Sequence, residues 1–469
     1  MTSMGQLSPC AEDDEEDAPS ACPTMLAVRR LSASERAPWW RARARLRELV
    51  SGSLVLIPTF YLAGAIALGV LLPALDRSHG SMLLGINAAE AESILEAVAS
   101  GMIAFAGLVV SVAVLVVQFG AGQYSPRLVH VFRRDPVIKN AIGLFVAPGV
   151  YALVAAADIG GTTHDGAETL TVAVALMLMV VALAALFRFI GRLLDLMRPR
   201  QLYARLAAQV QPALKSLYPS ASSRELERRP VSATPTSAVV IHPRHGEVLS
   251  AVDRNLLVRV ARRADAVIEV VAQIGSYVAQ DETILIVRGG RGIDERQARR
   301  ALMFTDGRSL LQDPSFAIRC IVDVVVRALS AAINDPTSAV EGLDALEGVL
   351  RPLGQRPLHS AAILDDDGAV RLVVPTPDWD ELLDLALSEI RWYGAGTPQV
   401  TRRLAALLDG LESSTSPGRR AAVGRHRMLL EEHLASVYAD EAERAFARTP
   451  DRLGIGGRPA TSDVSRGVR

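Results

Sequence analysis

The first half of the chain carries four long apolar stretches that are separated by short polar segments. They cover residues 54–75, 98–119, 137–157 and 170–190. An α-helix needs about 20 residues to cross the roughly 30 Å hydrocarbon core of a bilayer. Each stretch has about that length, so the pattern predicts four transmembrane helices in a membrane domain over residues 38–200.

The segments that flank these stretches alternate in charge. Basic residues gather ahead of the first stretch, between the second and third, and after the fourth: Arg41, Arg43, Arg45, Arg47, Arg127, Arg133, Arg134, Lys139, Arg192, Arg198 and Arg200. The other two loops are rich in carboxylates and contain Arg77. Since basic loops stay in the cytoplasm, we expect both termini there, with the helices in a bacterial plasma or inner membrane.

Composition narrows the class of protein. Roughly 270 of the 469 residues follow the fourth stretch and are available for soluble structure. The net charge of −1 gives no basic field for nucleic acid, so no nucleic-acid partner is expected. Nearly all basic residues are arginine, with Lys139 and Lys215 as the lysines, which is typical of a G+C-rich bacterial genome. The first apolar stretch begins about 50 residues in, which argues against a cleavable signal.

The remainder of the chain divides by pattern. Residues 201–237 are predicted to form a helical stalk, with Pro199 as a kink, followed by a Pro- and Ser-rich linker. Residues 238–290 are β-rich, and residues 291–449 are mainly helical with one hairpin at 361–374. Residues 1–37 and 450–469 are expected to be disordered tails. The fold class is therefore a transmembrane α-helical domain with a cytoplasmic α+β domain.

The β-rich segment has a strand–Gly turn–strand order that resembles half of the small barrel in biotinyl and lipoyl carrier domains. Those carriers need a lysine at a hairpin tip, and residues 238–290 contain none. We therefore expect a small structural β-barrel-like subdomain without a covalent cofactor, and the chain as a whole suggests no cofactor.

The second apolar stretch is the most patterned of the four. Positions at alternating steps of four and three share one helical face that carries small or polar residues: Ser100, Ala104, Gly107, Ser111, Val114 and Gln118. Small residues allow close helix packing in lipid, and Ser and Gln can form hydrogen bonds across the contact. The stripe is therefore either a helix-packing surface or the wetted lining of a pore in a homo-oligomer.

The strongest local signal in the helical region lies between residues 313 and 338. Arg319, Asp323 and Arg327 stand at i, i+4 and i+8 and so share one helical face. Asn334 and Asp335 end that helix, and Asp335 suits the N-cap of the next one, which Pro336 begins. The pattern fits a salt-bridged helix with a capped turn, or a ligand site in which Arg319 and Arg327 bind an anion.

The loop between the second and third stretches predicts an amphipathic connector at the inner leaflet. Ser125 can begin a short helix, while Arg127, Arg133 and Arg134 would lie near lipid phosphates. A gating or lipid-sensing role is the alternative to simple membrane association.

No catalytic or metal-binding pattern stands out. His242 and His245 have no third ligand nearby, which favours a surface turn over a zinc site. Residues 289–292 are glycine-rich but lack a phosphate-loop lysine, and the triple aspartate 365–367 lacks calcium-loop spacing. Cys10, Cys22 and Cys320 are scattered, without metal-pair spacing. We therefore expect no enzyme and no metal.

Three blocks of sequence carry a family resemblance. They are Gln118 with 123–128, Phe132 and Asp135; Asp313 with Phe316, Arg319, 322–323, 327–330 and 333–337; and 390–394. Together they resemble domain of unknown function 2254 (DUF2254), a bacterial family of predicted membrane proteins, over about residues 40–440. The chain departs from the family pattern at 330–331 and 147–149. The resemblance implies architecture and location, and it brings no substrate or catalytic residue.

Two hypotheses follow. The first is a multi-pass, homo-oligomeric inner-membrane protein with a channel-like or transport-related activity that its cytoplasmic domain regulates. The second is a membrane-tethered sensor or scaffold without a pore, which binds an anionic ligand or a protein partner.

Overall fold

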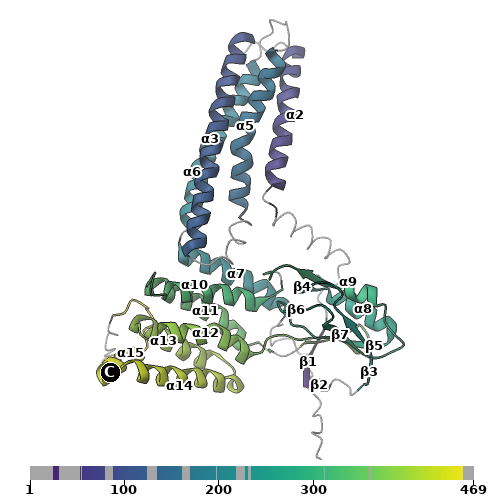
Figure 1. Cartoon of the computed structure of the whole chain (residues 1–469), viewed down its shortest axis with the longest axis vertical. Helices are drawn as coiled ribbons and strands as arrows, with labels where there is room; N and C mark the ends of the chain where they lie inside the picture. The colour runs from purple at the N-terminus through teal and green to yellow at the C-terminus, as the bar shows by residue number, and fades with distance from the viewer. Residues whose placement is uncertain are drawn as a thin grey trace, which may run out of the picture.

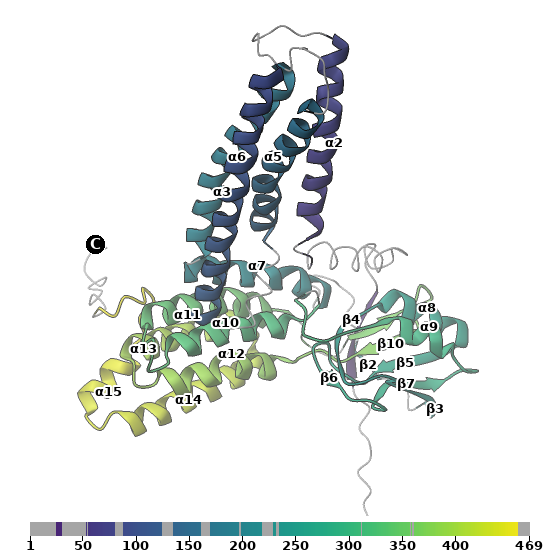
Figure 2. The same cartoon turned by 45° about the horizontal axis from the view of Figure 1, so that its top comes forward.

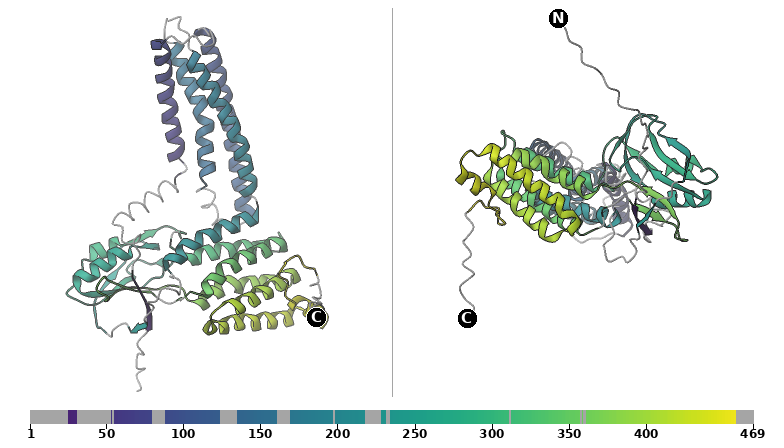
Figure 3. Two further views of the ribbon diagram at one scale, coloured as in Figure 1. Left: turned by 180° about the vertical axis from the view of Figure 1, so that it is seen from behind. Right: turned by 90° about the horizontal axis from the view of Figure 1, so that it is seen from below.

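The computed structural model describes residues 25–30, 53, 55–79, 88–123, 135–160, 169–196, 198–217, 228–230, 234–310, 312–356, 358 and 361–457. Four long helices form a column on a broad extramembrane region, in which a β-rich part and a helical part lie side by side (Figure 1; Figure 3, right). The predicted tails before residue 25 and after residue 457, and the central part of the predicted linker, lie outside the described residues.

The four predicted apolar helices are confirmed. They are α2 (Leu56–His79), α3 (Ala88–Gln123), α5 (Pro136–Gly160) and α6 (Thr169–Leu196). Each contains a segment long and apolar enough to cross a membrane: Leu56–Asp76, Ala88–Val116, Pro136–Gly160 and Thr169–Asp195. The helices extend beyond the apolar stretches, because polar residues at their ends also take up helical backbone hydrogen bonds, and water can satisfy the groups left over at the termini.

Helix α5 is the centre of this bundle, because 56% of its apolar membrane-spanning segment is buried, against 17% of the corresponding segment in α2. Phe145 of α5 stacks edge-to-face on Phe105 of α3 and Phe189 of α6, with ring centroids 5.5 and 5.7 Å apart. On the other side, a Cβ at Gly143 would lie 2.5 Å from the Tyr61 ring of α2, so only glycine permits this approach. The three outer helices therefore pack around α5.

The chain leaves α6 and begins a new helix, α7 (Pro199–Leu217), whose first residue is the proline predicted as a kink. Helix α7 lies across the top of the helical part, against α10 (Pro314–Ala328) and α11 (Pro336–Gly354) (Figure 2). Its buried residues recur at helical spacing: Leu202, Tyr203, Leu206, Val210 and Leu214. They join the bundle and the helical part in one continuous apolar cluster.

The strands form two open sheets. The seven-stranded sheet has the order β2 (Arg228–Pro230), β1 (Met25–Arg30), β9 (Ala361–Leu364), β10 (Val370–Val374), β5 (Ala266–Val270), β7 (Thr283–Gly289) and β3 (Thr236–Ile241). The three-stranded sheet has the order β6 (Tyr277–Val278), β4 (Glu247–Val252) and β8 (Leu302–Thr305). Helices α8 (Arg254–Ala264) and α9 (Glu295–Arg300) accompany them.

The predicted β-barrel-like subdomain is wrong, since neither sheet closes on itself in the described residues. In a closed barrel, the edge of β5 that does not face β7 would pair with β3. Here that edge of β5 pairs in parallel with β10, which belongs to the hairpin about 100 residues later in the sequence. The sequence pattern had indicated strands and turns but not which edges pair. The hairpin itself, Ala361–Leu364 with Val370–Val374, forms as predicted.

Strand β1 comes from the segment that was expected to be part of the disordered tail. Its residues Met25–Arg30 pair in parallel with β9, with Ala27 opposite Ala361. Backbone pairing in a sheet can order a short segment that has little apolar periodicity of its own. As a result, residues 25–30 and residues 361–364 must lie on the same side of the four-helix bundle.

The helical part is completed by α12 (Trp379–Gly394), α13 (Pro398–Ser414), a 3-10 turn (Pro417–Arg419), α14 (Arg420–Val437) and α15 (Glu441–Arg448). The chain after α15 returns to α13, where the buried Arg402 donates to the carbonyls of Thr449, Gly456 and Gly457. Residues 450–457, expected to begin a loose tail, are thus tied to the helical part.

Candidate functional site at the junction of the bundle and the extramembrane region

A buried carboxylate marks the end of the bundle that faces the extramembrane region, which we call the proximal end. Asp135 immediately precedes α5, and its Oδ1 accepts from the Val137 amide over 2.9 Å. Its Oδ2 accepts from Arg192 of α6, from Nε at 3.0 Å and Nη2 at 2.7 Å. The Asp135 side chain is only 3% exposed, so one carboxylate both caps α5 and ties it to the end of α6.

Arg205 of α7 approaches the same carboxylate. Its Nη1 lies 3.5 Å from Asp135 Oδ2, while its Nη2 is buried without a hydrogen-bond partner among the described residues. Burial is the main cause that lowers the pKa of Arg205, and the neighbouring Arg192 guanidinium lowers it further. Asp135 and Asp195 act in the opposite direction. Two guanidinium groups therefore share one carboxylate, and Arg205 holds the weaker contact.

Two contacts fix the start of α7 on α11. The Glu341 carboxylate of α11 accepts a hydrogen bond from the Arg200 backbone N–H. Burial raises the pKa of Glu341, while the charge of Arg200 has the opposite effect. At the next residue, a Cβ on Gly342 would lie 2.1 Å from the Val325 side chain of α10 and 3.0 Å from the Tyr203 ring of α7. Helices α7, α10 and α11 thus interlock around a position that has no room for a side chain.

The opposite, distal end of the bundle has its own carboxylate. Asp76 of α2 accepts from both the amide and the hydroxyl of Thr171 at 2.8 Å, and Tyr151 donates to the Thr171 carbonyl over 2.9 Å. Thr171 lies in the first turn of α6, where backbone N–H groups have no partner within the helix. This contact ties α2, α5 and α6 together, and its geometry is that of a helix cap.

The predicted ligand site around Arg319 forms a network of ion pairs. Arg319 donates from Nε to Asp323 over 2.6 Å, and its two terminal nitrogens bind the Glu389 carboxylate of α12. The hydrogen bond to Glu389 raises the pKa of Arg319, with burial opposing and Asp323 supporting it. Sequence reasoning missed Glu389, because a partner from another helix gives no local signal.

The other predicted members of this site lie elsewhere on α10 or at its end. Arg327 is exposed two turns further along the helix. Asn334 adopts a left-handed conformation with φ of 48°, and Asp335 caps α11 by accepting from the Ser338 amide over 3.1 Å. The described contacts thus bring Arg319 and Asp323 together, and place Asn334 and Asp335 in the turn between α10 and α11.

The predicted small-residue stripe faces away from the bundle. Ser100, Ala104, Gly107, Ser111 and Gln118 are all exposed, and the buried residues of α3 lie on its opposite face: Ala91, Leu95, Val98, Ala99, Met102, Ala106, Val109 and Ala113. The hydroxyls of Ser100 and Ser111 donate to carbonyls of their own helix, Ala97 at 3.2 Å and Gly107 at 2.8 Å. The predicted surface loop, with Ser125, Arg127, Arg133 and Arg134, lies outside the described residues.

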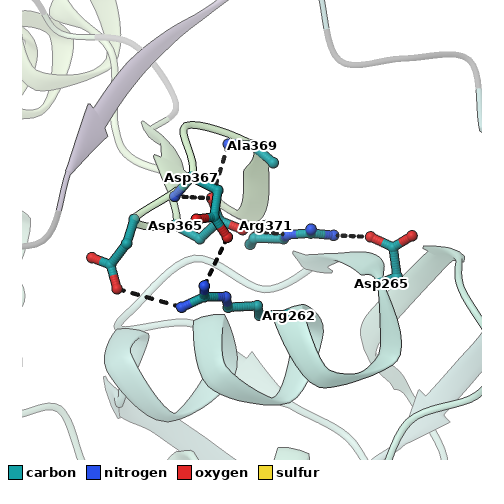
Figure 4. A network of polar contacts seen from close by, with 7 residues as sticks. Arg262, Asp265, Asp365, Asp367, Ala369 and Arg371 are labelled. Carbon is teal, nitrogen blue, oxygen red and sulfur yellow. Dashed lines mark hydrogen bonds and ion pairs between the residues drawn. The ribbon is translucent and has the colours of Figure 1, made fainter.

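The triple aspartate forms a turn that is paired with two arginines (Figure 4). Asp365 accepts from the amides of Asp367 and Ala369 and from Arg371 Nε, over 2.7–3.0 Å. Arg262 donates to Asp367 over 2.7 Å, and Arg371 also binds Asp265. The guanidinium groups offset part of the negative charge of these carboxylates. No group of three metal-binding side chains occurs in the part of the chain that is described.

One further buried group lies where the β-rich part meets the helical part. Asp313 caps α10 through Oδ1, which accepts from the Phe316 amide over 2.9 Å, while no described residue forms a hydrogen bond with the buried Oδ2. A Cβ on Gly275 would lie 2.1 Å from that Oδ2, and Gly275 has φ of 95°. Burial raises the pKa of Asp313 to about 6, against the hydrogen bonds and the Arg308 charge.

Only some of the residues at the junction were named from the sequence. Asp135 belongs to a block that carries the family resemblance, and Arg192 was noted for its charge. Arg205 was not singled out, although it lies three residues after Leu202 on the face of α7 opposite to the buried one. An arginine within two helical turns after Pro199, on the helix that follows the last apolar span, is the signal that would have found it.

Comparison with known proteins agrees with this architecture. A model of the predicted membrane protein family DUF2254 matches residues 51–410. Uncharacterised proteins from Mycobacterium bovis and Mycobacterium tuberculosis are 26% identical over 438 residues, which cover 90% of this chain and 83% of each relative. No solved structure matches. With four apolar spans and a family match over most of its length, the chain belongs to the predicted membrane protein family DUF2254.

Proposed function

We propose that this protein is a homo-oligomer of the bacterial inner membrane with a channel-like or transport-related activity, which its extramembrane region regulates from the cytoplasm. The observation that carries the proposal is the outward position of the stripe on α3. A bundle that needed these small residues only for its own packing would turn them inward. Here the inward face of α3 consists of other residues, such as Leu95 and Met102.

Small residues on a lipid-facing surface leave space that a neighbouring helix can fill. Nothing lies within 4 Å of the position that a Cβ at Gly107 would take. In lipid, helices associate through close van der Waals contact at such positions, because no hydrophobic effect distinguishes a helix from acyl chains. We therefore assign the stripe to contacts between protomers, next to the path that a transported solute would follow.

The cytoplasmic location of both ends has two supports. Arginine-rich segments flank the proximal end of the bundle, as expected for loops that stay in the cytoplasm. In addition, the pairing of β1 with β9 supports a common side of the membrane for the N-terminal strand and the C-terminal region, so that the first support applies to both.

A membrane-tethered sensor or scaffold without a pore is the second candidate. Its predicted anion site is disfavoured by the ion pairs of Arg319 with Asp323 and Glu389, because a ligand would have to displace two carboxylates. A metabolite screen by thermal shift on the full chain tests it. If a ligand stabilises the wild type but not Arg319→Ala, the sensor or scaffold would be favoured over the channel-like protein.

Cysteine cross-linking tests the oligomer directly. In a background without Cys10, Cys22 and Cys320, Gly107→Cys should form a disulfide-linked dimer in native membranes. Phe187→Cys is the matched control, since Phe187 is 76% exposed on α6 and lies away from the stripe. No dimer with Gly107→Cys, or equal dimer with both variants, would contradict the arrangement.

Flux measurements test the activity. Proteoliposomes that contain the wild-type chain should conduct ions or osmolytes, and Gly107→Leu should abolish that conduction by filling the stripe. Gly101→Leu is the control, because Gly101 is equally open but lies on another part of the α3 surface. A wild-type protein that passes nothing under voltage, tension or ligand would refute the pore.

A further inference from the structure

The junction between the bundle and α7 contains a cationic group that its surroundings do not fully satisfy. Arg205 Nη2 is buried and has no hydrogen-bond partner in the part of the chain that the structure describes. Leaving a buried donor of a charged group unpaired costs more than a typical hydrogen bond contributes. We propose that Arg205 binds a phosphate group at this junction, where Asp135, itself held by Arg192, positions the guanidinium.

The place of this group in the fold indicates where the phosphate lies. Asp135 directly precedes the apolar span Pro136–Gly160, and the span Thr169–Asp195 ends three residues after Arg192. Arg205 contacts Asp135 from α7, so its guanidinium lies at the boundary between the apolar helices and the extramembrane region. Lipid phosphates occupy that depth, just outside the hydrocarbon core.

The carboxylates near Arg205 are already engaged by other groups. Both oxygens of Asp135 are already engaged, Oδ1 by the Val137 amide and Oδ2 by Arg192 at 2.7 Å. Asp195 also acts on Arg205, but its Oδ1 accepts from the Gln201 side-chain amide over 2.9 Å. Arg205 is therefore left with the contact of 3.5 Å to a carboxylate that Arg192 holds more closely.

The chemistry of the donor selects phosphate among anions. A guanidinium group presents a planar fork of N–H donors that matches two phosphate oxygens, and it stays charged when partly buried. Basic pockets beside transmembrane helices on the cytoplasmic side are known to accept anionic lipid headgroups. The same fork would also accept inorganic phosphate, so the experiment has to distinguish the two sources.

Native mass spectrometry of the full-length chain in a neutral detergent measures the binding. Phosphatidylglycerol, phosphatidylcholine and inorganic phosphate are titrated separately. We expect phosphatidylglycerol to bind more tightly than phosphatidylcholine, and Arg205→Ala to weaken that binding about tenfold, the loss of one charge-assisted contact. Arg205→Lys, which keeps the charge but loses the planar fork of donors, should bind phosphatidylglycerol with an affinity between those of the wild type and Arg205→Ala.

Arg288→Ala is the control, because Arg288 is similarly half-buried and pairs with Glu269 in the β-rich part, away from the junction. Its affinity should equal that of the wild type. Binding of inorganic phosphate that Arg205→Ala weakens would also support the site and assign it to a soluble phosphate. Binding that is the same in the wild type and Arg205→Ala, or an equal loss in Arg288→Ala, would overturn the proposal. None of these outcomes depends on whether the protein conducts.

Discussion

Replacing Asp313 with asparagine should stabilise the extramembrane region, and by an amount that depends on pH. Asparagine is as good an N-cap as aspartate, so Asp313→Asn keeps the hydrogen bond to the Phe316 amide and removes the buried charge. Burial raises the pKa of Asp313 to about 6 from an ordinary value of 3.8. Since each pKa unit is worth about 1.4 kcal/mol, the ionised carboxylate costs the folded state about 3 kcal/mol at neutral pH.

The sign of the pH dependence follows from the direction of this change. Because the folded-state pKa lies above the unfolded one, protonation stabilises the folded protein fully below about pH 3.8, and this contribution is lost as the pH rises through about 6. Asp313→Asn should therefore exceed the wild type in melting temperature by several degrees at pH 8, and its advantage should shrink steadily between pH 6 and pH 4.

Thermal unfolding of the detergent-solubilised full chain at pH 4.5, 6 and 8 measures this effect, with intrinsic fluorescence as the probe. Asp313→Ala is the matched control: it also removes the charge but loses the cap, so it should melt below Asp313→Asn at each pH, by about 1 kcal/mol of stability. An asparagine variant that is no more stable than the wild type at pH 8, or whose advantage is the same at pH 4.5, would refute the reasoning.

Three other substitutions test the packing around the junction and the ends of the fold. Gly342→Ala should lower the stability by about 1–3 kcal/mol, seen as a fall in melting temperature, because its Cβ would lie 2.1 Å from the Val325 side chain, whereas Gly348 on the same helix has open space, so Gly348→Ala should stabilise the protein by about 0.5–1 kcal/mol. Asp76→Ala should destabilise the bundle by a similar amount, measured by thermal unfolding in detergent, since Thr171 loses the acceptor for its amide and hydroxyl. Arg402→Ala should release residues 449–457 and speed their cleavage in limited proteolysis, and an unchanged cleavage pattern would contradict the role of its three hydrogen bonds.

Elements that depend on local pattern could be predicted from the sequence. The four apolar helices, the hairpin at 361–374 and the cap at Asp335 all follow from residue type and spacing over a few turns. A helix or a two-stranded hairpin satisfies its own backbone hydrogen bonds with near neighbours. Its signal is therefore contained in the segment itself.

Elements that depend on distant partners could not be predicted in the same way. Strand β1 has a backbone partner more than 300 residues away in β9, and Glu389 reaches Arg319 from another helix. The barrel expectation failed for this reason, since the pairing of β5 with β10 is set by the packing of the whole extramembrane region. Likewise, the stripe on α3 was visible in the sequence, but its outward direction depends on which face of α3 contacts α5.

The two faces of α7 connect the bundle and the extramembrane region through different kinds of contact. One face buries five large side chains against α10 and α11, and each contributes about 1.5–3 kcal/mol when removed from water. These side chains belong to the apolar cluster that also includes the bundle. Away from this face, Arg205 adds a polar contact to the bundle, 3.5 Å from an Asp135 oxygen that Arg192 already holds at 2.7 Å. The connection between the two regions therefore depends mainly on buried apolar area, and the Arg205 contact is a smaller polar addition to it.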